Sequence, residues 1–198
     1  MIKYVLNSGG IKNASKLKRE FHQELVKSLG KAPKFLLCNF AQPREDWEPK
    51  FKGYSGAIAE DMPKGVNPSF ELAMPAKFVE QCKDTDVIYF HGGDTHLLHY
   101  WMQQYDLPEI LENKVVATNS ASSDMLAQSF WTCDWRASMD GLGILPIKFI
   151  PHYKSDFGGT DPRGPIDWQK AYDDLKIYGD ISLPIHALKE GEFIIINN

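Results

Sequence analysis

Residues 114–122 read KVVATNSAS, an apolar run that ends at a serine flanked by small residues. Short valine-rich runs of this kind predict buried strands. Because Ala121 and Ser122 are small, a helix can follow the strand after a very tight turn, and such a turn projects the side chain of Ser120 out of the sheet. The stretch therefore predicts a strand that ends at Thr118, a sharp turn, and a helix that begins at Ala121.

Strands and helices are expected to alternate along the rest of the chain. Strands are predicted over residues 2–6, 35–40, 86–90, 114–118 and 143–150, with a weaker one near 57–60. Helices are predicted over residues 13–29, 75–83, 94–105, 108–113, 121–129 and 166–177. The apolar runs near 181–187 and 192–196 are expected to form an edge hairpin. This alternation predicts one α/β domain over residues 1–198, with a mostly parallel sheet and helices on both faces.

The composition excludes several classes of protein. The chain has 198 residues, of which 43% are hydrophobic, so it can bury one sizeable core. Its net charge of -4 gives no basic surface for nucleic acid, and no run approaches the roughly 18 apolar residues that span a bilayer. Cys38, Cys82 and Cys133 form no C-x-x-C pair and are typical of reduced thiols. We expect a cytoplasmic monomer or homodimer that binds neither nucleic acid nor membranes.

Polar and glycine residues follow three of the predicted strands, in the segments 91–95 (HGGDT), 118–122 (TNSAS) and 151–153 (PHY). Ligands bind at the carboxyl ends of the strands in an open parallel sheet. Two successive glycines can direct backbone N–H groups toward an oxyanion, and the imidazole of His152 can take a proton from Ser120. We therefore expect nucleophile, oxyanion donors and base on one edge of a single sheet.

These segments resemble the dipeptidase E and cyanophycinase family of serine peptidases. In that family a Gly-Gly-Asn/Asp-Thr turn, a Gly-x-Ser-Ala-Gly elbow and a Pro-His-Tyr/Phe segment follow three strands. Residues 39–41, 140–146 and 187–191 are similar to the family as well, so the resemblance covers nearly the whole chain. It implies a three-layer sandwich of the class I glutamine amidotransferase kind. It also implies hydrolysis of short peptides, among them peptides that begin with aspartate, without a metal or another cofactor.

The resemblance also implies a role for individual residues. Ser120 is the expected nucleophile and His152 the base, and Asp134 best matches the third member of the triad, with Asp140 as its competitor. The expected oxyanion donors are the N–H groups of Gly93 and Ala121. The residues expected to bind the substrate are Gly92, Asp94, Thr95 and Arg163, where Arg163 would hold a substrate carboxylate and Arg136 is the second choice.

The predicted elbow departs from the family pattern at three positions. Thr118 and Ser122 replace its two glycines, and Asp124 stands where dipeptidase E has asparagine. A β-branched residue crowds a tight turn, and an anion at position 124 would repel an acidic substrate. An inactive homologue that binds a small ligand on the same scaffold is therefore one alternative.

A metal-dependent hydrolase is another alternative. His96 and His99 are three residues apart on a predicted helix and face the same side, with His91 nearby. Imidazole nitrogens are common zinc ligands. However, the spacing is not the H-E-x-x-H of metalloproteases, so we expect no metal.

Overall fold

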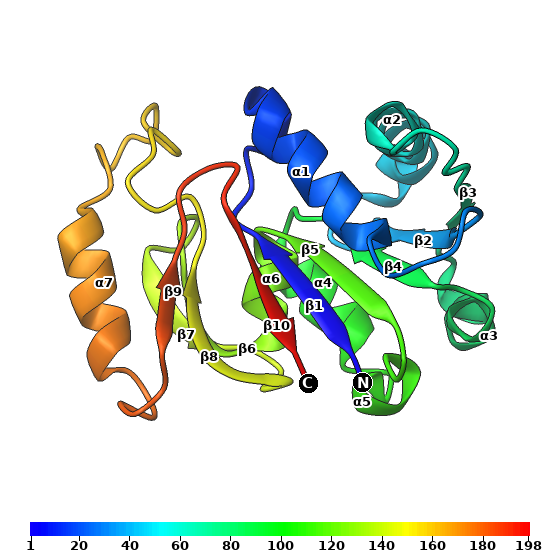
Figure 1. The fold of residues 1–198 in the computed structure, drawn as a ribbon. Helices are drawn as coiled ribbons and strands as arrows, with labels where there is room; N and C mark the ends of the chain where they lie inside the picture. The colour runs from blue at the N-terminus through cyan, green and yellow to red at the C-terminus, as the bar shows by residue number, and fades with distance from the viewer.

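The computed structural model describes residues 1–198, and its strands form two separate sheets (Figure 1). The strands are β1 Lys3–Asn7, β2 Lys34–Cys38, β3 Ser69–Leu72, β4 Val87–Phe90, β5 Val115–Asn119, β6 Ala127–Thr132, β7 Ala137–Asp140, β8 Leu145–Ile150, β9 Ile185–Ala187 and β10 Phe193–Asn197. The α-helices are α1 Ser15–Val26, α2 Trp47–Asp61, α3 Phe78–Lys83, α4 Thr95–Met102, α5 Leu107–Ile110, α6 Ala121–Leu126 and α7 Trp168–Ile177.

The larger sheet has six strands in the order β10-β1-β5-β4-β2-β3. All neighbouring strands in it are parallel except β10, which runs antiparallel to β1. Every residue of β4 is buried, as expected for a parallel strand with both faces covered. Because β1, β5 and β4 are neighbours, the segments that follow these three strands meet at one edge of the sheet.

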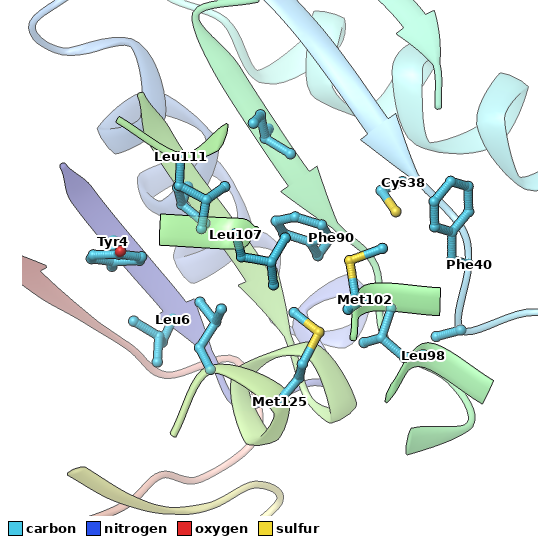
Figure 2. Close-up of a cluster of buried hydrophobic side chains, with 14 of the residues drawn as sticks. Tyr4, Leu6, Cys38, Phe40, Phe90, Leu98, Met102, Leu107, Leu111 and Met125 are labelled. Carbon is cyan, nitrogen blue, oxygen red and sulfur yellow. The ribbon is translucent and has the colours of Figure 1, made fainter. Parts of the chain in front are cut away.

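Helices cover both faces of this sheet, which confirms the predicted α/β fold (Figure 1). On one face, Phe21 and Leu25 of α1 pack with Ile58 of α2 against the sheet. On the other face, side chains of α4, α5 and α6 pack against the strands; Figure 2 shows Met102 and Met125 beside Phe90 and other buried residues. Each large apolar side chain buried in this way contributes about 1.5–3 kcal/mol to folding.

The smaller sheet has four strands in the order β7-β6-β8-β9, with β6 and β8 parallel. Phe130 and Phe149 of this sheet join the same apolar core as α6, whereas α7 covers the other face and packs on Trp131 and Ile150. The buried Nζ of Lys148 in β8 donates to three backbone carbonyls at the end of α7, and this fastens the helix to the sheet.

Three of the predicted elements are wrong. Residues 57–60 belong to α2 and not to a strand. The helix predicted over 121–129 ends at Leu126, and the chain continues as β6, since Phe130 and Trp131 fit a pleated surface. The predicted hairpin does not form, because β9 pairs with β8 and β10 pairs with β1. No helix combines the length and apolar character that crossing a membrane requires.

Candidate active site

Ser120 occupies a strained turn between β5 and α6. Its φ of 54° and ψ of -113° lie where a residue with a side chain is rarely found. The turn is held by its own backbone, since the N–H of Ser120 donates to Asn7 O at 3.0 Å and its carbonyl accepts from the N–H groups of Ser123 and Asp124. This geometry presents the half-buried side chain of Ser120 above the edge of the larger sheet, as a nucleophile elbow requires.

The residues that replace the elbow glycines fit the turn without strain. Ser122 is fully buried, and its Oγ donates to Phe90 O at 2.6 Å and accepts from the N–H of Asn119 at 2.7 Å. The hydroxyl of Thr118 pairs with that of Ser123 at 2.7 Å. The side chains of Thr118 and Ser122 stabilise the elbow through these hydrogen bonds, and neither of them bonds to the hydroxyl of Ser120.

The imidazole of His152 reaches Ser120 from the smaller sheet. His152 follows β8, and its Nε2 lies 3.0 Å from Ser120 Oγ. The prediction that both residues lie on one sheet edge is therefore wrong, because β8 and β5 belong to different sheets. The ring of Phe157 stacks on the imidazole at 4.2 Å, and the N–H of His152 donates to Ser8 Oγ at 2.7 Å. These contacts fix the ring in place.

The other ring nitrogen of His152 is bonded to a glutamate and not to the predicted aspartate. Its Nδ1 lies 2.9 Å from Oε1 of Glu190, in the connection between β9 and β10. Because a carboxylate only accepts, Nδ1 carries the proton and the lone pair of Nε2 faces Ser120. The exposed Asp134 forms no side-chain hydrogen bond with His152, and Asp140 pairs with Ser129 toward the opposite end of the smaller sheet. Glu190 thus takes the place expected for Asp134.

Burial lowers the pKa of His152, and the hydrogen bond and charge of Glu190 partly oppose this shift. The imidazole is therefore neutral near pH 7. A neutral imidazole whose Nε2 faces a hydroxyl can accept the proton of that hydroxyl.

Two glycines after β1 leave room for His152 and Glu190. A Cβ on Gly9 would collide with the imidazole of His152, and one on Gly10 would lie 2.6 Å from Cδ of Glu190. Both glycines also have a positive φ, 104° and 65°, which disfavours other residues. The sequence draws attention to this turn only as the end of a strand, so its role and that of Glu190 went unpredicted.

One expected oxyanion donor, the N–H of Ala121, directly follows Ser120, and the other, that of Gly93, lies in the turn after β4. A Cβ on Gly92 would lie 3.3 Å from Ser120 Cβ, so this turn passes close to the expected nucleophile. The N–H groups of Gly93 and Ala121 donate to no backbone carbonyl. These N–H groups therefore have no backbone carbonyl that would compete with an oxyanion.

Of the residues expected to bind substrate, Asp94 and Thr95 serve the start of α4. Asp94 Oδ1 accepts from the N–H of Leu97 at 2.7 Å, an N-cap, and Thr95 is buried. Arg163 is occupied: its Nε donates to Asp161 Oδ1 at 2.9 Å and its Nη2 to the backbone carbonyl of Asp134 at 2.8 Å. Its charge is therefore already matched by a carboxylate.

Asp124 lies one turn of α6 beyond Ser120. Its side chain is buried, and Oδ1 has no hydrogen-bond partner. Burial, aided by the charge of Asp134, raises its pKa well above the usual range. Position 124 therefore favours a neutral acid over the anion that the sequence suggested.

The three histidines of the metal alternative lie in different surroundings. The ring of His91 is stacked on Tyr54 at 3.7 Å, His96 packs against Trp135, and His99 packs against Phe130. No group of three His, Cys, Asp or Glu side chains is arranged to hold a metal ion. The geometry gives this alternative no support.

A hydroxyl, a neutral imidazole and a carboxylate in one hydrogen-bonded row, on an α/β scaffold, are the features of serine hydrolases. The comparison with protein families agrees and is more specific. The chain belongs to peptidase family S51, whose model matches residues 8–198. This confirms the resemblance to the dipeptidase E family and makes the protein a serine-type peptidase.

Solved structures show the same fold. The chain is similar to a peptidase from an acI-B1 Actinobacterium, with a TM-score of 0.68 and 22% identity over 98% of this chain and 82% of that one. It is also similar to a putative peptidase E protein from Listeria monocytogenes EGD-e, with a TM-score of 0.67 and 16% identity over 99% of this chain and 94% of that one. No curated protein sequence matches it significantly.

Proposed function

We propose that this peptidase hydrolyses short peptides through a triad of Ser120, His152 and Glu190. The observation that carries the proposal is the row of two hydrogen bonds, 3.0 Å from Ser120 Oγ to His152 Nε2 and 2.9 Å from His152 Nδ1 to Glu190 Oε1. The backbone at or next to each of these residues is held by a hydrogen bond of its own. The arrangement is therefore preorganised for proton transfer from the serine hydroxyl.

In the first half of the reaction, Ser120 Oγ forms a bond to the peptide carbonyl carbon as its proton moves to Nε2 of His152. The carbonyl π electrons pass to the oxygen, which becomes an oxyanion. The N–H groups of Gly93 and Ala121 donate to that oxygen. When the C–N bond breaks, the proton on Nε2 passes to the leaving amine and an acyl-enzyme remains.

In the second half, water attacks the acyl-enzyme and gives its proton to Nε2. Breaking the ester bond returns this proton to Ser120 and releases the acid. Glu190 stabilises the imidazolium that forms in each half. No step requires a metal ion.

The proposed substrates are short peptides, without a requirement for aspartate at the N-terminus. Such a requirement would need a free cation near the nucleophile, and the guanidinium of Arg163 is bound to Asp161 instead. The exposed Asp134, whose charge acts on His152, also disfavours a second carboxylate at this site.

The proposal is tested by hydrolysis of a panel of dipeptides, Asp-Leu, Leu-Leu, Lys-Leu and Ala-Leu, by wild type and Ser120→Ala. Wild type should cleave at least one of them at a rate that a chelator leaves unchanged, and Ser120→Ala should lose about 10⁴-fold or more. Absence of turnover from folded wild type on every peptide would contradict the proposal and favour the binding-protein alternative.

A further inference from the structure

The N–H of Gly93, an expected oxyanion donor, belongs to the peptide bond between Gly92 and Gly93. Neither of these residues can fix the orientation of that peptide. Gly92 and Gly93 both lack side chains, and Gly93 has a φ of 151°, which residues with a side chain rarely adopt. The peptide bond between them joins the carbonyl of Gly92 to the N–H of Gly93. A glycine pair has an unusually wide choice of backbone angles, so this peptide needs an external contact to keep one orientation.

Gln42 supplies that contact from the turn after the neighbouring strand. It follows β2, and its Nε2 donates to the carbonyl oxygen of Gly92. In a planar trans peptide the C=O and N–H bonds point in opposite directions. Since β2 and β5 lie on opposite sides of β4, a Gly92 carbonyl held toward Gln42 turns the N–H of Gly93 toward Ser120.

Lys50 of α2 fixes the orientation of the Gln42 side chain. The Nζ of Lys50 donates to Gln42 Oε1. Because an ammonium group can only donate, the amide oxygen must face Lys50 and the amide NH₂ must face Gly92. The carbonyl of Gln42 also accepts from Trp47 Nε1 at 2.9 Å, which holds its backbone.

We propose that Gln42 and Lys50 are positioning residues for the oxyanion hole. This inference rests on the proposed serine mechanism and extends it to two residues that do not touch the reacting atoms. The hydrogen bonds run in one direction, from the ammonium of Lys50 through the amide of Gln42 to the peptide between Gly92 and Gly93. Bonds aligned in this way polarise one another, so the cation strengthens the N–H of Gly93 as a donor. Without Gln42 the peptide can turn over and present a carbonyl oxygen to the oxyanion.

The test compares Gln42→Ala, Gln42→Glu and Lys50→Met with wild type, using the best dipeptide of the panel. Loss of one oxyanion donor costs about 10²–10³-fold in kcat. We expect Gln42→Ala to lower kcat by about 10- to 100-fold with little change in KM, because the donor is misdirected in only part of the population. Gln42→Glu should lose at least as much, since a carboxylate has no N–H to offer, and Lys50→Met should lose only about 3-fold.

Two inhibitors separate this role from a merely structural one. A peptide aldehyde forms an adduct with Ser120 whose oxygen occupies the oxyanion hole, whereas the matching peptide alcohol binds without one. Gln42→Ala should weaken inhibition by the aldehyde by the same factor as kcat and leave inhibition by the alcohol unchanged. The control is Gln104→Ala, which removes a glutamine that donates to a backbone carbonyl, that of Tyr100, elsewhere on the molecule. Its kinetics should match wild type.

A folded Gln42→Ala enzyme with wild-type kcat and aldehyde affinity would overturn the inference while the serine mechanism stands. If that variant does not fold, Gln42→Glu and Lys50→Met decide in the same way. Should Ser120→Ala retain full activity, the proposed function fails first, and the inference fails with it.

Discussion

The two halves of the proposed active site are built in different ways. The half that carries Ser120 belongs to the six-stranded sheet, and its parts are backbone groups or residues held by the backbone of neighbouring strands. The half that carries His152 belongs to the four-stranded sheet, and its parts are side chains far apart in sequence. The first half depends on local chain geometry, whereas the second depends on how the two sheets meet.

The connection between β9 and β10 joins these halves. On one side, Leu188 exchanges backbone hydrogen bonds with the chain around His152, at 3.1 Å with Ile150 O and 2.8 Å with the N–H of Tyr153. On the other, the N–H of Gly191 donates to Gly9 O at 2.8 Å, next to β1. Glu190 lies between these contacts, so one short segment both links the sheets and orients the imidazole.

The largest effect on kcat is expected from replacing His152, whose imidazole reaches from the smaller sheet to Ser120. His152→Gln should lower kcat by about 10⁴-fold or more, because Ser120 then loses its base. The measurement is kcat for the best dipeptide, with circular dichroism to confirm folding. A loss smaller than about 10-fold would mean that the half carrying Ser120 works without the other half.

Glu190→Gln and Asp134→Asn form a matched pair that tests which carboxylate orients His152. Glu190→Gln should lower kcat by about 10³-fold, since the glutamine cannot stabilise the imidazolium and its amide favours the wrong tautomer. Asp134→Asn should change kcat by less than about 5-fold, because it makes no hydrogen bond to His152. The reverse ranking of the two variants would restore Asp134 as the third member of the triad.

The pH dependence of kcat/KM gives an independent view of the same contact. Only neutral His152 can act as the base, and burial lowers its pKa, so activity should fall with decreasing pH around a midpoint below the usual histidine value of about 6.5. Glu190 opposes that shift, so the midpoint should move to still lower pH in Glu190→Gln. A midpoint that rises in the variant would contradict this assignment.

The half that carries Ser120 could be predicted from the sequence, because its signals are local. Small residues after a valine-rich strand predict the elbow, and paired glycines after a strand predict the turn that carries Gly93. The sequence also predicts His152 as the base through its segment, but it places both residues on one sheet. The sequence did not predict the second sheet, because Ala127, Gln128 and Ser129, which begin β6, directly follow a short helix and resemble its continuation.

Glu190 could not be assigned from the sequence for a physical reason. It lies in a Lys-Glu-Gly segment that is typical of a surface turn, and the similarity of residues 187–191 to the family assigns no role to Glu190 itself. Its role follows from the separate pairing of β9 and β10, which carries the segment between the sheets. The Gly9-Gly10 turn is related to this role only in the folded protein, where its missing side chains leave the space that His152 and Glu190 occupy.

The Gly9-Gly10 turn offers the next test of how the two sheets meet at His152 and Glu190. Gly9→Ala places a Cβ against the imidazole and strains a backbone with a φ of 104°, so kcat should fall by about 10- to 100-fold as His152 is displaced. Gly53→Ala in α2, where no atom lies within 4 Å of the added Cβ, is the control and should keep wild-type activity. Equal activity in the two variants would show that His152 tolerates movement at the junction.

The smallest effect is expected at Asp124, in the helix α6 that follows the elbow, and it concerns the thermal stability of the protein. Its pKa is raised in the folded state, so the unfolded chain releases the proton first and stability falls as pH rises above the unfolded pKa of about 3.9. Asp124→Asn removes this loss. At pH 8 its Tm should exceed that of wild type by about 2–4 °C for each kcal/mol gained, and near pH 4 the two should agree. A lower Tm for the variant at pH 8 would show that the carboxylate is stabilised by a contact.

The most direct test of a site assembled across two sheets is the rate at which a fluorophosphonate modifies Ser120, followed by mass spectrometry of the intact protein and its peptides. We predict one adduct, on the peptide that contains Ser120, formed at least about 10²-fold more slowly in His152→Gln and Glu190→Gln than in wild type and absent in Ser120→Ala. An adduct on another residue, or an equal rate in the His152 and Glu190 variants, would contradict the assignment of this serine, imidazole and carboxylate as one triad.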